Sequence, residues 1–138
     1  MRTILGLMCG AVALGALPAT AGDVREKVEL TFSEREHLKA GMRAYLDNIQ
    51  GVVEGLSKHD FKAVSRAATK SGMAAVKSVP VALALRLPPQ FTLMSIDTHE
   101  KFDALAREAG EKRTNLAANK ALNDVLASCT ACHAMFKF

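Results

Sequence analysis

The chain has 138 residues, which is the size of one ordinary domain and long enough to bury a core of its own. Aromatic residues are scarce and tryptophan is absent, while alanine, leucine, lysine and glutamate are abundant, a composition typical of helical proteins. The net charge of +4 is too small to indicate a nucleic-acid-binding protein, although it would suit an acidic protein partner.

Residues 1–21 have the three parts of a secretory signal peptide. Arg2 supplies the charged start, residues 4–17 are an apolar run, and an Ala-x-Ala cleavage signal ends at Ala21. The apolar run is short for a helix that spans a bilayer, so we expect cleavage rather than a membrane anchor. The sequence therefore predicts a periplasmic protein whose mature domain is residues 22–138, with no membrane insertion after cleavage.

Two amphipathic segments open the mature domain. In the first, residues 33–57, apolar residues recur every three or four positions, and Ser33 is the expected N-cap. Its apolar stripe consists of Leu38, Met42, Tyr45, Ile49, Val52, Val53 and Leu56. The second segment, residues 60–77, has Asp60 as its expected cap, and Gly72 weakens it part-way.

An apolar connection and two further helices follow. Residues 79–89 hold three prolines, which argue against a continuous helix there. The third helix is predicted over residues 98–117 with Asp97 as its cap, and the fourth over residues 120–136 with Asn119 as its cap.

No segment alternates with period two, so no sheet is expected. Four amphipathic helices joined mostly by short loops predict an all-α fold, an antiparallel four-helix bundle. Each apolar stripe would pack against the other three, and a ligand could lie in the core between them.

The residues that carry chemistry are Cys129-Thr130-Ala131-Cys132-His133, a C-x-x-C-H sequence. This spacing is the attachment signature of c-type haem. Positions three and four apart share one face of a helix, so both thiols can bond the haem vinyl groups while the imidazole of His133 reaches the iron. One covalent haem c is therefore predicted, bound by Cys129, Cys132 and His133, with His133 as a metal ligand.

Three other interpretations of the cysteine pair fit less well. A disulfide across three residues closes too small a loop to stabilise an exported protein by much. A thioredoxin-like thiol pair normally opens a helix that follows a strand, whereas this pair lies late in a predicted helix. A closed zinc site needs four ligands, and only three are in sight.

The second axial position of the iron decides what such a protein does. Methionine gives a low-spin electron carrier, whereas an empty position gives a high-spin haem that binds small gases. The candidates in the mature chain are Met42, Met73, Met94, His37, His59 and His99. From these residues alone the choice stays open.

A helical domain with C-x-x-C-H on its last helix, followed by Phe136 and Lys137, resembles the class II cytochromes c, the cytochrome c′ family. The resemblance covers residues 22–138 and implies a four-helix bundle with haem in its core. Low-spin members of the family take a methionine from the first helix as sixth ligand. Met42 lies at the corresponding place, sixteen residues before Lys58. The resemblance therefore implies Met42 as the second metal ligand.

Together, motif and resemblance predict a carrier of single electrons that is not an enzyme. The alternatives are a five-coordinate cytochrome c′ that binds NO or CO, a haem-free thiol oxidoreductase, and a haem subunit of a larger enzyme. The expected partners are redox proteins. Lys39, Arg43 and Lys137 either steer an acidic partner or form a solvated face. The resemblance also implies that a homodimer could form through the first two helices.

Overall fold

The computed structural model describes residues 22–138. The predicted signal peptide, residues 1–21, lies outside the described residues. The described chain is mostly helical, which agrees with the predicted all-α class. Its helices are α1 (Phe32–Ser57), α2 (Phe61–Thr69), the 3-10 helix η1 (Met73–Ser78), α3 (Val81–Arg86), α4 (Pro89–Lys112) and α5 (Asn115–Met135).

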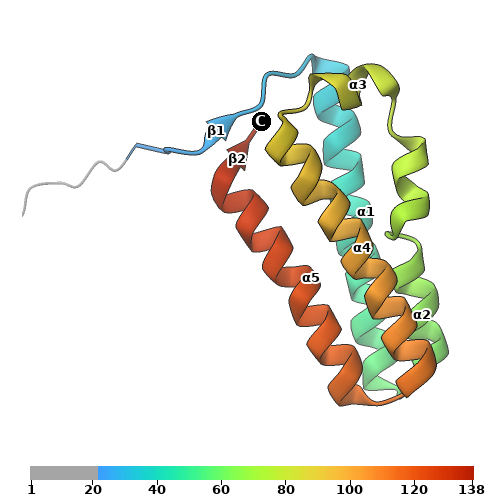
Figure 1. Cartoon of the computed structure of the whole chain (residues 1–138). Coiled ribbons are helices and arrows are strands. Elements are labelled where there is room, and N and C mark those ends of the chain that lie inside the picture. The colour runs from blue at the N-terminus through green and yellow to red at the C-terminus, as the bar shows by residue number, and fades with distance from the viewer. Residues whose placement is uncertain (1–21) are drawn as a thin grey trace, which may run out of the picture.

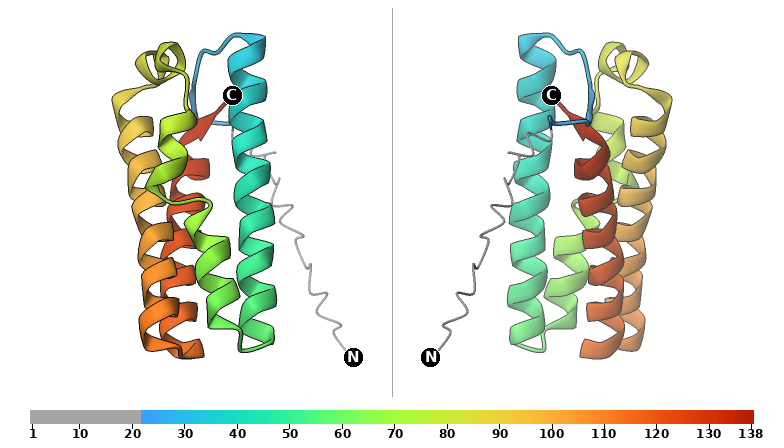
Figure 2. Two further views of the ribbon diagram at one scale, coloured as in Figure 1. Left: turned by 90° about the vertical axis from the view of Figure 1, so that its right-hand side faces the viewer. Right: turned by 90° about the vertical axis from the view of Figure 1, so that its left-hand side faces the viewer.

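The long helices lie side by side along a common direction (Figures 1 and 2). α1 packs on α2, α2 packs on α4, and α4 packs on α5. α1 and α5 touch each other much less, so the side of the molecule between them is the least closed. Within residues 22–138, no helix has the length and apolar character needed to cross a membrane.

A capping box begins α1, two residues earlier than predicted. The Thr31 hydroxyl accepts a hydrogen bond from the backbone N–H of Glu34, and the Glu34 carboxylate accepts one from the N–H of Thr31 at 2.8 Å. The predicted cap, Ser33, is therefore wrong. The Glu34 carboxylate also pairs with the Arg86 guanidinium at 2.9 Å, a contact across the fold that favours this box over the later one.

The second predicted helix breaks in the middle. α2 begins at its predicted cap, Asp60, but ends at Thr69, and the chain continues as η1. At the break, the backbone N–H of Met73 donates to the Asp103 carboxylate at 2.9 Å. A Cβ on Gly72 would overlap that carboxylate, so the close approach of α4 requires glycine here.

The apolar connection at residues 79–89 is not one continuous helix, as expected, but it contains the short helix α3, and α4 begins nine residues before its predicted start at 98. Pro80 and Pro88 are the N-caps of these two helices, and Pro89 is the first residue of α4. Proline is tolerated at that position because its missing N–H would have no helical partner there. Asp97, the predicted cap, therefore lies inside α4.

The turn between α4 and α5 lies about five residues earlier than predicted. Arg113 adopts a left-handed backbone conformation (φ 50°) that ends α4. Thr114 caps α5, because its hydroxyl accepts a hydrogen bond from the N–H of Ala117 at 3.2 Å. Asn119, the predicted cap, lies inside α5.

Two short strands join segments from the two ends of the described chain. β1 (Glu26–Lys27) pairs in parallel with β2 (Phe136–Lys137), and the N–H of Val28 donates to the carbonyl of Lys137 at 2.8 Å. The prediction of no sheet is wrong, because strands of two residues are too short to show any alternation. We call residues 23–28 the N-terminal strap.

The core consists of two clusters of buried side chains. The larger lies where α1, α2, α4 and α5 meet: Val52, Leu56, Val64, Ala68, Phe102, Leu105, Ala106, Ala109, Ala118, Ala121, Leu122 and Val125. The smaller lies beside the strap: Val28, Phe91 and Phe136. We call the end of the molecule that holds the larger cluster the closed half, and the end that holds the smaller cluster the open half.

Candidate functional site

The four predicted site residues surround one cavity of about 310 Å³. Cys129, Cys132 and His133 reach it from α5, and Met42 reaches it from α1. α4 closes the third side with Phe91, Ser95 and Thr98. We call this space the motif cavity. It lies on the open side between α1 and α5.

The motif lies at the border between the closed and open halves. Cys129 packs against the larger core cluster and Cys132 against the smaller one. Both side chains are half-buried free thiols, whereas His133 is exposed. Because α5 continues unbroken to Met135, the three motif residues keep the helical spacing that sets them on one face.

Burial controls the ionisation of the two thiols. It raises the pKa of Cys129, and it raises the pKa of Cys132, where the neighbouring charge of Cys129 adds to the effect. Nucleophilic cysteines of redox enzymes have a lowered pKa, because a helix N-terminus or a nearby cation stabilises the thiolate. The surroundings of this pair act in the opposite direction.

Of the six candidate axial ligands, all of which lie in the described part of the chain, Met42 alone lines the motif cavity. Met94 packs in the smaller cluster, and His59 lies in the turn between α1 and α2 with a positive φ of 53°. Met73 begins η1. The placement of Met42 follows from the apolar stripe of α1, which turns it towards α4 and α5.

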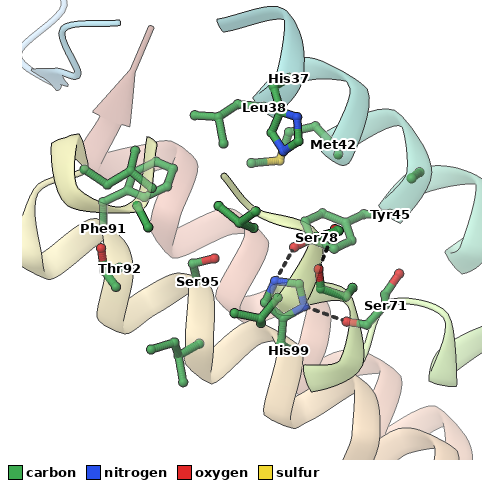
Figure 3. Close-up of a pocket in the computed structure, with 18 of the residues that line it drawn as sticks. His37, Leu38, Met42, Tyr45, Ser71, Ser78, Phe91, Thr92, Ser95 and His99 are labelled. Atoms are coloured by element: carbon green, nitrogen blue, oxygen red, sulfur yellow. Dashed lines mark hydrogen bonds between the residues drawn. The ribbon is translucent and has the colours of Figure 1, made fainter. Parts of the chain in front are cut away.

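A second cavity of about 380 Å³ lies on the other side of Met42. It is bounded by α1, η1, α3 and α4, and Figure 3 shows Met42 extending from α1 into the space that faces Phe91 and Ser95 of α4. We call it the side cavity. The two cavities share Met42, Tyr45, Phe91 and Ser95 as walls.

His99 is buried, with 4% of its surface exposed, and it lines the side cavity. Its Nδ1 lies 2.8 Å from the carbonyl oxygen of Ser71, and its Nε2 lies 2.8 Å from the hydroxyl of Tyr45 (Figure 3). A carbonyl oxygen only accepts, so Nδ1 carries the proton, and Nε2 accepts the proton of the Tyr45 hydroxyl. Both ring nitrogens are therefore engaged within the fold.

Tyr45 links the site to the closed half. Its ring stacks on Phe102 with centroids 5.6 Å apart, and its hydroxyl binds His99. Burial, reinforced by the charges of the two motif cysteines, raises the pKa of Tyr45 to about 12. The sequence shows Tyr45 on the apolar stripe of the first helix but gives no sign of its partner on α4.

The N-terminal strap lies against the end of the motif, which the sequence did not indicate. The Arg25 guanidinium donates to the backbone carbonyl of His133 at 3.4 Å and pairs with Asp23 at 2.7 Å. Lys137 donates to the carbonyl of Asp23 at 3.0 Å. These bonds hold the strap beside the last turn of α5.

Comparisons with protein-family models, with curated proteins and with solved structures find no match to this chain. What the site does must therefore be inferred from its own residues.

Proposed function

We propose that the protein is a periplasmic mono-haem c-type cytochrome, a four-helix bundle of the class II kind, that carries single electrons. The observation that carries this proposal is the convergence of a C-x-x-C-H motif on α5 and a methionine on α1 around one cavity. Each of these residue types has a defined part in binding haem c, and their meeting from separate helices is what a six-coordinate site requires.

The chain's residues fit such a group. The motif cavity has mainly apolar walls and lies on the open side between α1 and α5, which suits a large flat macrocycle with one edge at the surface. Arg35 lies seven residues before Met42, two turns along the same face of α1. Its buried Nε has no hydrogen-bond partner among the described residues. Arg35 could therefore pair with a haem carboxylate.

The residues would share the work as follows. Cys129 and Cys132 would hold the macrocycle by thioether bonds, and His133 and Met42 would ligate the iron. A bound haem supplies a one-electron couple. The protein sets its potential through the methionine ligand and through apolar walls such as Phe91, which exclude water.

A five-coordinate haem protein that binds NO or CO is the second candidate. The side cavity favours it, because that space lies directly against Met42 and gives the side chain room to pack away from an iron. A thiol oxidoreductase has less support, since burial raises the pKa of both cysteines.

The proposed partner surface is less charged than the sequence implies. Lys39 pairs with Glu36 at 3.0 Å, and Lys137 pairs with Asp23 at 3.4 Å. These two lysines are partly neutralised within the chain, so steering of an acidic redox partner would depend more on Arg43. A homodimer through α1 and α2 stays a prediction.

Haem staining after denaturing electrophoresis tests the covalent attachment. The wild-type band should stain, and the double variant Cys129→Ser, Cys132→Ser should not, because thioether bonds alone survive denaturation. An unstained wild type, expressed with a haem-attachment system, would exclude a c-type cytochrome.

Absorption spectra then test the sixth ligand. Met42→Ala should convert a low-spin spectrum to a high-spin one that responds to CO. Met94→Ala is the matched control, because Met94 is a partly buried methionine of the open half that packs in the smaller cluster. A wild type that is already high-spin would favour the gas-binding candidate.

A further inference from the structure

The side cavity has apolar walls and a polar floor. Leu38, Leu87 and Ile96 are among its apolar walls, and α3 covers its mouth with Val81 and Leu85, which are largely exposed. At about 380 Å³ it is within the range of small-molecule pockets and far larger than a diatomic gas requires. None of the three motif residues on α5 lines it, among the residues that the structure describes.

The floor of the side cavity offers one hydrogen-bond acceptor, the hydroxyl oxygen of Tyr45. The Nδ1–H of His99 donates a hydrogen bond to the carbonyl oxygen of Ser71. The Nε2 of His99 therefore accepts a hydrogen bond from the Tyr45 hydroxyl. The Tyr45 oxygen has then used its only donor and keeps lone pairs that can accept. A ligand that satisfies this oxygen must bring an O–H or N–H group.

We propose that the side cavity binds a small neutral aromatic molecule of one or two rings with a single hydrogen-bond donor, such as an indole or a phenol, whose donor binds the Tyr45 oxygen. The rings of Tyr45 and Phe91, which both line the cavity, suit an aromatic ligand, because rings pack favourably edge to face. Lys70 also lines the cavity and disfavours a cationic ligand. This site goes beyond the proposed electron transfer and does not depend on haem.

Indole is the probe, and 1-methylindole, which lacks the N–H donor, is the matched ligand control. Binding is measured by calorimetric titration of the purified, full mature protein. Indole should bind, and 1-methylindole should bind about threefold to tenfold more weakly, the usual effect of one neutral hydrogen bond. Equal affinities for the two compounds would overturn the role of the Tyr45 oxygen.

Two variants of α3 locate the bound molecule. Ala84 lines the side cavity, and Ala82 lies on the same short helix outside the lining, while both side chains are exposed. Ala84→Phe should therefore fill the cavity and abolish binding of indole, whereas Ala82→Phe should leave the affinity unchanged. If Ala84→Phe binds indole as tightly as wild type, the molecule sits elsewhere, for example in the motif cavity, and the proposal fails.

Tyr45→Phe tests the hydrogen bond directly. It should weaken indole to the affinity of 1-methylindole and leave 1-methylindole unchanged, while thermal unfolding verifies that the variant is folded. Haem staining of the same samples reports on the electron carrier separately. A protein that stains for haem and shows no indole binding overturns only this inference, and one that binds indole without staining overturns only the haem proposal.

Discussion

The closed and open halves of the molecule share the long helices α1, α4 and α5 but are packed differently. In the closed half, alanines and valines of neighbouring helices fill the core, and Val52, Val64 and Phe102 are fully buried. In the open half, the buried cluster shrinks to Val28, Phe91 and Phe136, and two cavities open beside it.

This difference separates stability from ligand binding. Small side chains bring helices close together, and dense packing there provides most of the favourable free energy of folding. The open half gives up that packing and keeps α1 apart from α5, and the strap closes its end instead. A helical domain of this size can therefore reserve one end for a ligand because the other end stabilises the fold.

Truncation of one leucine in each half should give the largest contrast. Leu105 is fully buried in the closed half, and Leu46 is 67% exposed at the edge of the motif cavity. Leu105→Ala should lower the free energy of unfolding by about 3 kcal/mol, and Leu46→Ala by less than about 1 kcal/mol. Urea denaturation measures both. Equal losses would mean that the two halves are packed equally well.

Two glycine substitutions compare a tightly packed position with an open one. Gly72→Ala should cost about 2 kcal/mol, because the new Cβ displaces the Asp103 carboxylate from the N–H of Met73. Gly41→Ala, on an exposed part of α1 where a Cβ meets nothing within 4 Å, should instead add about 0.5–1 kcal/mol. Thermal unfolding of the two variants should thus show shifts of opposite sign.

The ionisation of Tyr45 tests how well its side chain is buried between the closed half and the two cavities. Its pKa is about 12 in the folded chain against an ordinary value of 10.0, so the unfolded chain loses this proton first as the pH rises. The contribution of this group to the free energy of unfolding is therefore fully present below pH 10. It is lost as the pH rises towards 12, and the loss is on the order of 2 kcal/mol.

Tyr45 is the only tyrosine in the chain, so tyrosinate absorption follows its titration without overlap. Tyr45→Phe should remove both the absorption change and the part of the alkaline destabilisation due to this group. A titration midpoint near pH 10 in the folded protein would show that Tyr45 is solvated.

The smallest expected effect concerns the motif cysteines in protein made without haem. Burial raises the pKa of Cys129 and Cys132, so fewer thiolates are present at neutral pH and alkylation should be slower than in the urea-unfolded chain. The rate of iodoacetamide labelling, followed by mass spectrometry, measures this difference. Faster labelling of the folded chain would restore the thiol oxidoreductase as a candidate.

Some features of this fold could be predicted from local sequence and others could not. The apolar stripes and the spacing of the motif are local patterns, and they predict the helical class and the shared face of Cys129, Cys132 and His133. Met42 was implied by the family resemblance and not by a local pattern. The start of α4 was missed because proline is compatible with a first helical turn as well as with a break.

The features that the sequence does not indicate involve partners far apart in the chain. The burial of His99 depends on Tyr45, which is 54 positions away, and the end of α2 depends on Asp103 of α4. The strap depends on residues of β2 more than 100 positions further on. No local pattern encodes such pairings, so they became visible only in three dimensions.

The strap also has a consequence for the order of events during folding. Its hydrogen bonds join Asp23 and Lys137, which are 114 positions apart, so they close the longest loop of the described chain and carry a large entropic cost. Contacts of such separation tend to form late. Until they form, Val28 of the strap is missing from the cluster against which Cys132 packs, so the end of α5 is the last part of the helical domain to be covered.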